Sequence, residues 1–445
     1  MLSGDTLRQL AADELVQLEQ EGCEVAQLRE RYEQVLLGET DDPAQAGQAA
    51  LMEFFGQAAE LTPAAGWPYE EPSDLEGIRA ARPETDRART AIDEATLRDR
   101  TAGAWLGRCI GCMMGKPIEG KSREEIEAIL RAADAYPLTG YFPVVENVPE
   151  GISYPPPDDP CLAPNITRGV RDDDTDYTTL GLHIIEQFGP QVTPGQIVQE
   201  WLVRLPHHRT YTAERAAMRN WVNEIMPPES ARYMNPYREW IGAQIRADGW
   251  AYCAPGWPER AAEYAWRDAC TTHTKNGIYG EMFFGALIAA CFATDDLNDA
   301  LQVALAEIPA NCRLAEAVRE CLGWCEQDET WEQTWERIIE KYGHYHRVHT
   351  INNALLCLMG LLHAGGDMRR AIAIAVMGGL DTDCNGATVG SVMGALLGEA
   401  GVPRDLSEPL NDTLEVALAG MPLLKISDLV DRTLEMAEVT LSSAG

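Results

Sequence analysis

The stretch Gly103-Ala-Trp-Leu-Gly-Arg-Cys-Ile-Gly-Cys-Met-Met-Gly115 places a glycine at every fourth position. The same period returns far downstream, from Gly386 to Gly398. Each glycine inside a helix costs about 1 kcal/mol relative to alanine, so two such runs need a compensating cause. A four-residue period clears one stripe of side chains along a helix, and another backbone can then approach closely. We therefore expect two buried central helices that pack on each other.

Helical periodicity extends over most of the remaining chain. Apolar residues recur three and four positions apart, and no alternation of strands and helices typical of a parallel sheet is present. The pattern predicts an all-α fold with one compact helical domain over residues 91–445, in which residues 136–165 form a long loop. The expected helices are 101–114, 124–133, 177–187, 196–205, 214–224, 260–270, 280–292, 297–307, 314–325, 351–363, 368–377 and 386–397.

Residues 1–90 differ from the rest and are interpreted as an acidic helical extension with a linker. Leu7, Leu10, Leu15 and Leu18 lie at helical spacing, and a further helix is expected near residues 44–59. Four prolines then mark the linker, since proline interrupts helices. They are Pro63, Pro68, Pro72 and Pro83.

The charge balance excludes several classes of partner. The chain has 36 Lys and Arg against 70 Asp and Glu, a formal net charge of −34. The electrostatic field of this net negative charge repels nucleic-acid phosphates and anionic lipids, so neither is expected as a partner. The glycine runs also resemble membrane-dimer motifs, but Arg108, Lys116 and Glu119 interrupt the first of them. Without an export signal, the twelve cysteines are expected to be reduced thiols in the cytoplasm.

Two short segments concentrate carboxylates, and one of them lies between strongly apolar helices. They are Asp172, Asp173, Asp174 and Asp176 after Arg171, and Asp381 and Asp383 near residue 380. A solvated acidic face explains the first segment as well as a functional site does. The second does not fit that explanation, because two carboxylates about 4 Å apart repel by about 4 kcal/mol at an effective dielectric constant of 20. Arg171 is the only cation within either motif, so a divalent metal is the economical counter-charge.

The types of ligand atom narrow the choice of metal. Carboxylates, together with the hydroxyls of Thr175 and Thr382, are hard oxygen donors that suit Mg²⁺, Mn²⁺ or Ca²⁺ rather than zinc. Two rival motifs are weaker. Cys109 and Cys112 with Cys321 and Cys325 are more simply explained as buried thiols on helices, and His344, His346 and His349 as a helix cap or a pocket wall.

Three segments occur in the order and separation of a known family. They are the glycine-rich run ending at Glu119, the triplet Asp173-Asp174-Thr175, and Gly378-Gly-Leu-Asp-Thr-Asp-Cys-Asn385. From about residue 91 to its end the chain thus resembles the ADP-ribosylglycohydrolases, which include dinitrogenase-reductase-activating glycohydrolase and the ADP-ribosylhydrolases. The resemblance implies an all-helical domain that holds two Mg²⁺ or Mn²⁺ ions.

The resemblance also implies roles for individual residues. Glycosidic cleavage passes through an oxocarbenium-like state that carboxylates stabilise, and a metal-bound water is the nucleophile that suits it. Glu119 and Asp174 are the candidates for activating this water, and the choice between them stays open. The implied metal ligands are Asp172, Asp173, Asp174, Asp381 and Asp383.

This sequence departs from the family pattern at three places. Asp172 stands where a hydroxyl residue is usual, and Cys384 replaces a threonine after the second Asp of the third motif. A thiol binds Mg²⁺ poorly, so water, Asn385 or Thr382 is left for that coordination position. The family's glycine-rich diphosphate loop has no clear counterpart, because the candidate segment 210–215 lacks glycine.

Substrate binding is therefore assigned to other side chains. Tyr211, Arg215 and Lys116 are expected to take over the diphosphate, and His273 matches a pocket histidine of the family. A position beside a helix cap explains His273 equally well. The aromatic residues expected to stack on the adenine are Trp250, Tyr252 and Trp257.

The leading hypothesis is a metal-dependent hydrolase that releases ADP-ribose from a protein side chain or a small molecule. One alternative is an N-glycosidase of another ribosylated metabolite. The other is a catalytically silent binding protein on the same fold. The five matched carboxylates disfavour silence, because repelling acids destabilise a protein that does not use them.

Overall fold

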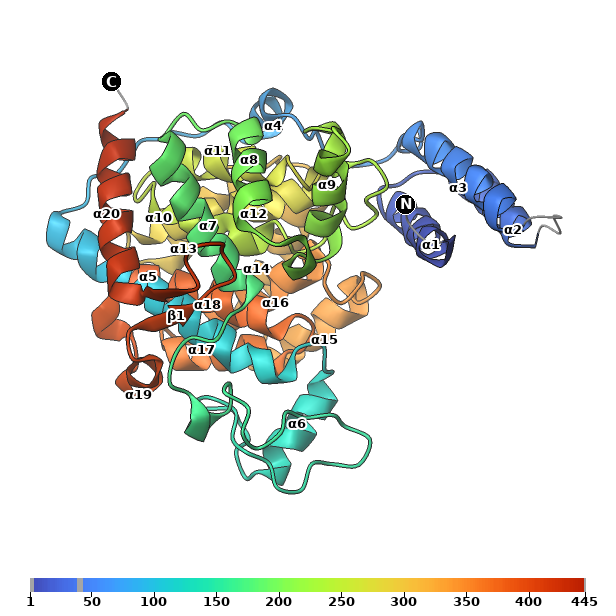
Figure 1. Cartoon of the computed structure of the whole chain (residues 1–445). Helices are drawn as coiled ribbons and strands as arrows, with labels where there is room; N and C mark the ends of the chain where they lie inside the picture. Colours follow the sequence, from blue (N-terminus) through green and yellow to red (C-terminus); the bar gives the residue numbers. More distant parts are fainter. Residues whose placement is uncertain (1–3, 38–42, 444–445) are drawn as a thin grey trace.

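The computed structural model describes residues 4–37 and 43–443 (Figure 1). Nearly all regular structure is helical, which confirms the predicted all-α class. Two short strands, β1 (Thr413–Glu415) and β2 (Leu423–Lys425), pair antiparallel with Thr413 opposite Lys425. Among the described helices, none combines the length and the hydrophobicity that a bilayer crossing requires.

The helices before residue 90 are α1 (Gly4–Gln20), α2 (Ala26–Leu37), α3 (Pro43–Ala59) and α4 (Leu75–Ala81). The following helices are α5 (Glu94–Gly115), α6 (Arg123–Ala132), α7 (Asp173–Phe188), α8 (Pro194–Arg204), α9 (Thr212–Val222), α10 (Ala247–Tyr252), α11 (Pro258–Ala269), α12 (Lys275–Cys291), α13 (Leu297–Leu305), α14 (Arg313–Gln327), α15 (Trp331–Tyr342), α16 (Thr350–His363), α17 (Met368–Met377), α18 (Thr382–Leu397), α19 (Arg404–Ser407) and α20 (Ile426–Ser442). The short 3₁₀ helices are η1 (Lys116–Ile118), η2 (Ala163–Asn165), η3 (His207–Arg209), η4 (Glu229–Ala231), η5 (Gln244–Arg246), η6 (Glu399–Gly401) and η7 (Glu408–Leu410).

Every helix expected from periodicity is present, and four begin four or more residues earlier than expected. The helices expected from residues 101 and 177 begin at Glu94 and Asp173. The helix expected from residue 280 begins at Lys275, and the helix expected from residue 386 begins at Thr382. This last shift places Asp383 in the first turn of α18, with Asp381 as its N-cap residue. Four further helices were not predicted from the periodicity: α4, α10, α15 and α20. For α15, the capping box of Thr330 and Gln333 was an available signal.

The two glycine-striped helices, α5 and α18, pack on each other in antiparallel orientation. Gly103 lies against Gly394 and Gly398, whereas Gly115, at the other end of α5, lies against Thr382 and Asp383. A Cβ atom added at Gly103, Gly107, Gly111 or Gly115 would approach backbone atoms of this partner segment to less than 3.0 Å. The predicted contact between the stripes is confirmed, and it brings the end of α5 to the start of α18.

The first three helices lie to one side of the main helical body in Figure 1 and form their own apolar cluster. Leu10, Leu18 and Phe54 are among its buried members. Buried ion pairs join this unit to the rest of the chain. Arg238 binds Glu14 at 2.8 Å and Glu21 at 2.6 Å, and all three side chains are buried.

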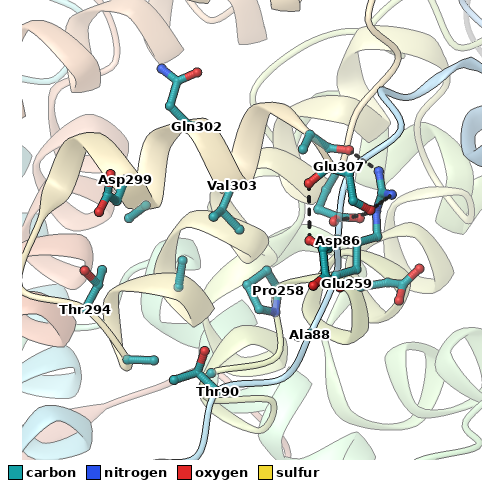
Figure 2. A pocket seen from close by; sticks show the side chains of 17 residues that line it. Asp86, Ala88, Thr90, Pro258, Glu259, Thr294, Asp299, Gln302, Val303 and Glu307 are labelled. Atoms are coloured by element: carbon teal, nitrogen blue, oxygen red, sulfur yellow. Dashed lines mark hydrogen bonds and ion pairs between the residues drawn. The ribbon is translucent and has the colours of Figure 1, made fainter.

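The segment that leads from α4 into α5 is also anchored by charge. Arg82 and Arg87 both bind the buried carboxylate of Glu307, Arg87 through its Nε at 3.0 Å. Residues 85–90 then pass over a cavity of about 280 Å³ that α13 and the start of α11 also line (Figure 2). The proline-rich linker is thus fixed to the core at this point.

We propose residue 90 as the approximate boundary of the catalytic unit, and the ion pairs predict the effect of truncation. A chain of residues 91–445 leaves Glu307 and Arg238 without their partners, so its free energy of unfolding should fall by more than about 3 kcal/mol. A chain of residues 61–445 keeps Arg82 and Arg87, so its free energy of unfolding should lie between those of the full chain and the 91–445 chain. Urea unfolding checks this order, and metal-dependent stabilisation should survive in both. A folded 91–445 chain that no longer responds to metal would contradict the boundary.

Candidate active site

Three segments far apart in sequence meet where α5 and α18 make their last close contact. Thr382 donates a hydrogen bond from Oγ1 to the carbonyl oxygen of Gly115 at 2.8 Å. This contact brings Glu119, which follows η1, to the first turn of α18. The N-terminus of α7, capped by Asp172, is the third segment.

The carboxylates of these segments form overlapping groups. Glu119, Asp381 and Asp383 carry ligand atoms that all lie within 4.8 Å of one another. Asp383 also belongs to a second such group, with Asp174 and Cys384. A third group contains Cys112, Asp172 and Asp174. Asp383 and Asp174 thus connect a continuous series of donor atoms across the start of both helices.

Asp172 is neutralised by a cation that the motif itself does not contain. The ammonium of Lys116 forms an ion pair with Oδ2 of Asp172, while Oδ1 accepts a hydrogen bond from the backbone N–H of Asp174 at 3.2 Å. Burial opposes the charge of Asp172, but Lys116 outweighs it and holds the pKa of this carboxyl below its usual range. Lys116 was expected at the substrate diphosphate, and in the structure it serves this carboxylate instead.

Asp174 is fully buried and bound on one side only. Its Oδ1 accepts a hydrogen bond from Arg108 at 2.8 Å, and the same guanidinium lies 3.2 Å from Asp248. Its Oδ2 is buried and has no hydrogen-bond partner in the described part of the chain. Burial raises the pKa of Asp174 well above its usual range, although Arg108 acts in the opposite direction.

Asp381 and Asp383 lie in a region of concentrated negative charge. Burial and the charge of Glu119 raise the pKa of Asp381 to about 6. Burial, Glu119 and Asp172 raise the pKa of Asp383 well above its usual range. Oδ1 of Asp383 is buried without a partner among the described residues. The N-terminal dipoles of α7 and α18 favour negative charge here, but each contributes only about 0.3–1 kcal/mol.

Cys384 stands where the family has a threonine, and Thr382 and Asn385 are the side chains that could replace it as a metal ligand. Both already donate hydrogen bonds to other groups. Oγ1 of Thr382 donates to Gly115, and the amide of Asn385 donates to Asn353 at 2.9 Å. Burial and Asp174 raise the pKa of the Cys384 thiol well above its usual range, and a thiol is a soft donor that suits Mg²⁺ poorly. These hydrogen bonds fix both side chains through their donor atoms and leave an oxygen lone pair on each, so water, Asn385 and Thr382 all stay candidates for this position.

The donor set fits hard divalent cations. Buried carboxylate oxygens without partners, in groups that share Asp383 and Asp174, are suited to Mg²⁺ or Mn²⁺. The thiols are not: burial and Asp172 raise the pKa of Cys112 well above its usual range. Glu119 is the exposed member of the set and borders solvent.

The sequence model of the ADP-ribosylglycohydrolase family matches residues 93–439. The chain belongs to this family. Its members are hydrolases, so this ADP-ribosylglycohydrolase is an enzyme that cleaves glycosidic bonds of ADP-ribose conjugates. No curated protein matches the chain. A solved structure described as an ADP-ribosylglycohydrolase-related protein complex is 17% identical and covers 78% of this chain and 99% of its own, with a TM-score of 0.46.

In this ADP-ribosylglycohydrolase, Tyr211 and Arg215 are exposed at the start of α9. The guanidinium of Arg215 lies 5.5 Å from the centre of the Tyr211 ring, and its Nε donates to the carbonyl of Thr210 at 2.7 Å. Arg171 joins this segment to the acidic motif, because it donates to the carbonyl of Arg209 at 3.2 Å and pairs with Asp176 at 2.6 Å. Asp173 is half-buried beside them and belongs to none of the donor groups above.

The structure does not bring His273 to the carboxylate groups. His273 is buried, its Nδ1 lies 2.7 Å from Oγ1 of Thr272, and its Nε2 lies 4.0 Å from Glu214. It borders a cavity of about 640 Å³ whose lining includes Glu21 and Ser73 but none of the site carboxylates. The position beside the start of α12 is the one that the helix-cap explanation predicted.

Of the three residues expected to stack on the adenine, two were assigned wrongly. Trp250 and Tyr252 are buried in the core, where the Tyr252 hydroxyl donates to the carbonyl of Ala104 at 3.2 Å. Neither ring has a free face for adenine. Trp257 is half-buried and already carries the guanidinium of Arg260 at 4.7 Å from its ring centre.

The rival metal motifs are structural. His349 is the N-cap of α16, and its Nδ1 accepts from the backbone of Ile351 at 3.1 Å. His346 stacks on Trp240 with ring centres 4.1 Å apart. Cys321 is buried on α14, and no metal-ligand group among the described residues contains it.

Proposed function

We propose that this enzyme requires divalent metal, Mg²⁺ or Mn²⁺, to cleave the bond between ADP-ribose and an acceptor. The observation that supports this most directly is the pair of buried oxygens without partners, Oδ2 of Asp174 and Oδ1 of Asp383. Such atoms cost free energy unless something binds them. Because Asp383 belongs to two donor groups, two adjacent ions suit the arrangement better than one.

Four of the proposed ligands belong to these groups: Asp174, Asp381 and Asp383 supply buried oxygens, and Asp172 belongs to the third group. Asp173 is proposed as a further ligand for its place in the first turn of α7, although it lies outside the groups. When bound, the ions lower the pKa of a coordinated water and compensate the negative charge. The carboxylates themselves stabilise the positive charge that develops on the ribose as the glycosidic bond breaks.

We assign the role of general base to Glu119 rather than Asp174. Oδ1 of Asp174 is held by Arg108 inside the protein, which suits a ligand and not a group that exchanges protons with solvent. Glu119 is exposed and borders Asp381 and Asp383. Its carboxylate can accept a proton from an attacking water and release it to solvent.

Hydrolysis assays with ADP-ribosylated arginine, ADP-ribosylated serine and ADP-ribosylated small molecules test the assignment. Glu119→Gln should lower kcat by about 10²–10⁴-fold while leaving metal-dependent stabilisation in place. Glu124→Gln, which changes an exposed glutamate five residues away, should leave the rate unchanged. Full activity in Glu119→Gln would remove the base assignment. Inactivity of the parent enzyme on every conjugate, with hydrolysis of a smaller ribosylated compound, would favour the alternative N-glycosidase.

We propose the cytoplasm as its location. All twelve cysteines are free, and most of them are buried, which suits a reducing compartment. The net charge of −34 supports a small conjugate or a protein as the partner rather than nucleic acid or a membrane surface. Fractionation of cells, followed by activity assay, tests the location.

A further inference from the structure

Most cations around the carboxylate groups are already bound. Lys116 pairs with Asp172, Arg108 with Asp174 and Asp248, and Arg171 with Asp176. These pairs neutralise the acids from inside the protein. None of them leaves a cation available to an anionic substrate, although any ADP-ribose conjugate carries a diphosphate that the acidic site repels.

Arg347 is different. It is exposed, and in the described part of the chain its guanidinium has no hydrogen bond and no ion pair. The guanidinium lies directly on Gly120, the residue after Glu119: a Cβ atom at Gly120 would be 2.9 Å from Nη1 and 3.2 Å from Cζ. Its positive charge also acts on Asp381, where it lowers the pKa against the effects of burial and Glu119.

The absence of a side chain at position 120 makes this placement possible. Gly120 has a φ of 75°, a conformation that L side chains rarely adopt, and any side chain there would meet the guanidinium. The backbone turns sharply after Glu119 and leaves the face over Gly120 to Arg347. The guanidinium thus borders the exposed end of the site without occupying the buried donor groups.

The backbone of Arg347 is coupled to the proposed metal ligands. Asn353, buried on α16, donates from Nδ2 to the carbonyl of Arg347 at 2.8 Å. Its Oδ1 accepts from the backbone N–H of Asp381 at 3.2 Å. One buried amide therefore holds both the segment that carries Arg347 and the segment that carries Asp381.

Ring contacts on both sides of Arg347 restrict this segment further. His346 stacks on Trp240 at 4.1 Å with an interplanar angle of 6°, and His349 stacks on Tyr345 at 4.2 Å. The backbone is thus fixed while the guanidinium is exposed. This combination is typical of a side chain that is preorganised to bind a ligand.

We infer that Arg347 binds the phosphate oxygens of the substrate. Its guanidinium thus takes the place of the glycine-rich diphosphate loop that this chain lacks. This inference rests on the proposed function, because it needs a phosphorylated ribosyl substrate. Arginine suits the role: its planar fork donates two parallel hydrogen bonds to a phosphate, and it remains charged at every physiological pH. The ligand chemistry is a phosphate attached to the ribose next to the scissile bond.

Calorimetry in the presence of Mg²⁺, with the full chain, tests the inference. Arg347→Ala should bind ADP-ribose and ribose 5-phosphate roughly 10- to 100-fold more weakly than the parent, and Arg347→Lys should restore part of the loss. In turnover assays KM should rise with little change in kcat, by the same factor for every acceptor. Arg370→Ala, which removes an exposed arginine at the far end of α17, is the matched control and should bind like the parent.

The possible results separate this inference from the proposed function. If the parent binds ADP-ribose and Arg347→Ala binds it equally well, Arg347 is not a phosphate ligand, and the function stands. An effect that differs between acceptors would place Arg347 on the acceptor and would also overturn the inference. A loss of the Mg²⁺-induced rise in Tm would reduce Arg347 to a structural role. A parent that binds neither compound would remove both the inference and the proposed function.

Discussion

Gly111→Ala is expected to lower the free energy of unfolding by more than about 3 kcal/mol, the upper end of the usual cost of overpacking. The new methyl group would meet the carbonyl oxygen of Gly386 and the backbone N of Ala387. Both are backbone atoms of a buried helix, so no change of rotamer relieves the collision. Alanine gains about 1 kcal/mol of helix propensity over glycine, and the sign of the result shows which effect dominates. Urea unfolding gives the measurement.

Gly323→Ala is the matched control. Gly323 lies inside α14, and no atom lies within 4 Å of the position of an added Cβ. Only the propensity term remains, so this variant should be more stable than the parent by up to about 1 kcal/mol. Equal changes in the two variants would mean that the contact between α5 and α18 does not require the glycines.

Asp383→Asn is expected to remove most of the stabilisation by metal. Asp383 belongs to two of the three donor groups, so one substitution weakens both. For the parent, Mg²⁺ or Mn²⁺ at 100 times its Kd should add about 2.7 kcal/mol to the free energy of unfolding and raise Tm accordingly. In the variant, the rise in Tm should nearly vanish, and the rate of hydrolysis should fall with it.

The same variant has an opposite effect without metal. In a chelator, the charge of Asp383 is repelled by Glu119, Asp172 and Asp381, and asparagine removes this repulsion. Metal-free Asp383→Asn should therefore melt above the metal-free parent, and thermal scans with and without chelator measure both effects. Glu124→Gln should follow the parent in each condition. An equal response of Asp383→Asn and parent to metal would refute the metal assignment.

Features set by local pattern were predictable from the sequence. The four-residue glycine period led to the contact between α5 and α18, because only close backbone packing compensates for so many helical glycines. The two acidic motifs were correctly placed together for a similar reason: carboxylates next to apolar helices need a shared counter-charge. The resemblance to the family then supplied the chemistry.

The counter-charges themselves were not predictable. Arg108 lies on α5 and Lys116 directly after it at the start of η1, both far in sequence from Asp174 and Asp172, and only the packing of this segment near α7 selects them as partners. The signal available was a charged residue inside a buried helix, which is rarely left unpaired. Trp250 illustrates the opposite error, because it was expected to stack on the adenine of the substrate and instead fills the core.

The distance in sequence between α5 and α18 has a consequence for synthesis of the chain. The hydrogen bond between Thr382 and Gly115 spans 267 residues. At about 5–20 residues per second, a ribosome needs roughly 13–53 s to pass from one to the other. During this time the glycine face of α5 has no partner, and a helix so rich in glycine is poorly stable alone. The contact between α5 and α18 therefore forms late, and a nascent chain that ends between Asp176 and Asp381 contains the first acidic motif without the second. Ribosome stalling at defined lengths would reveal when α5 becomes protected from amide exchange.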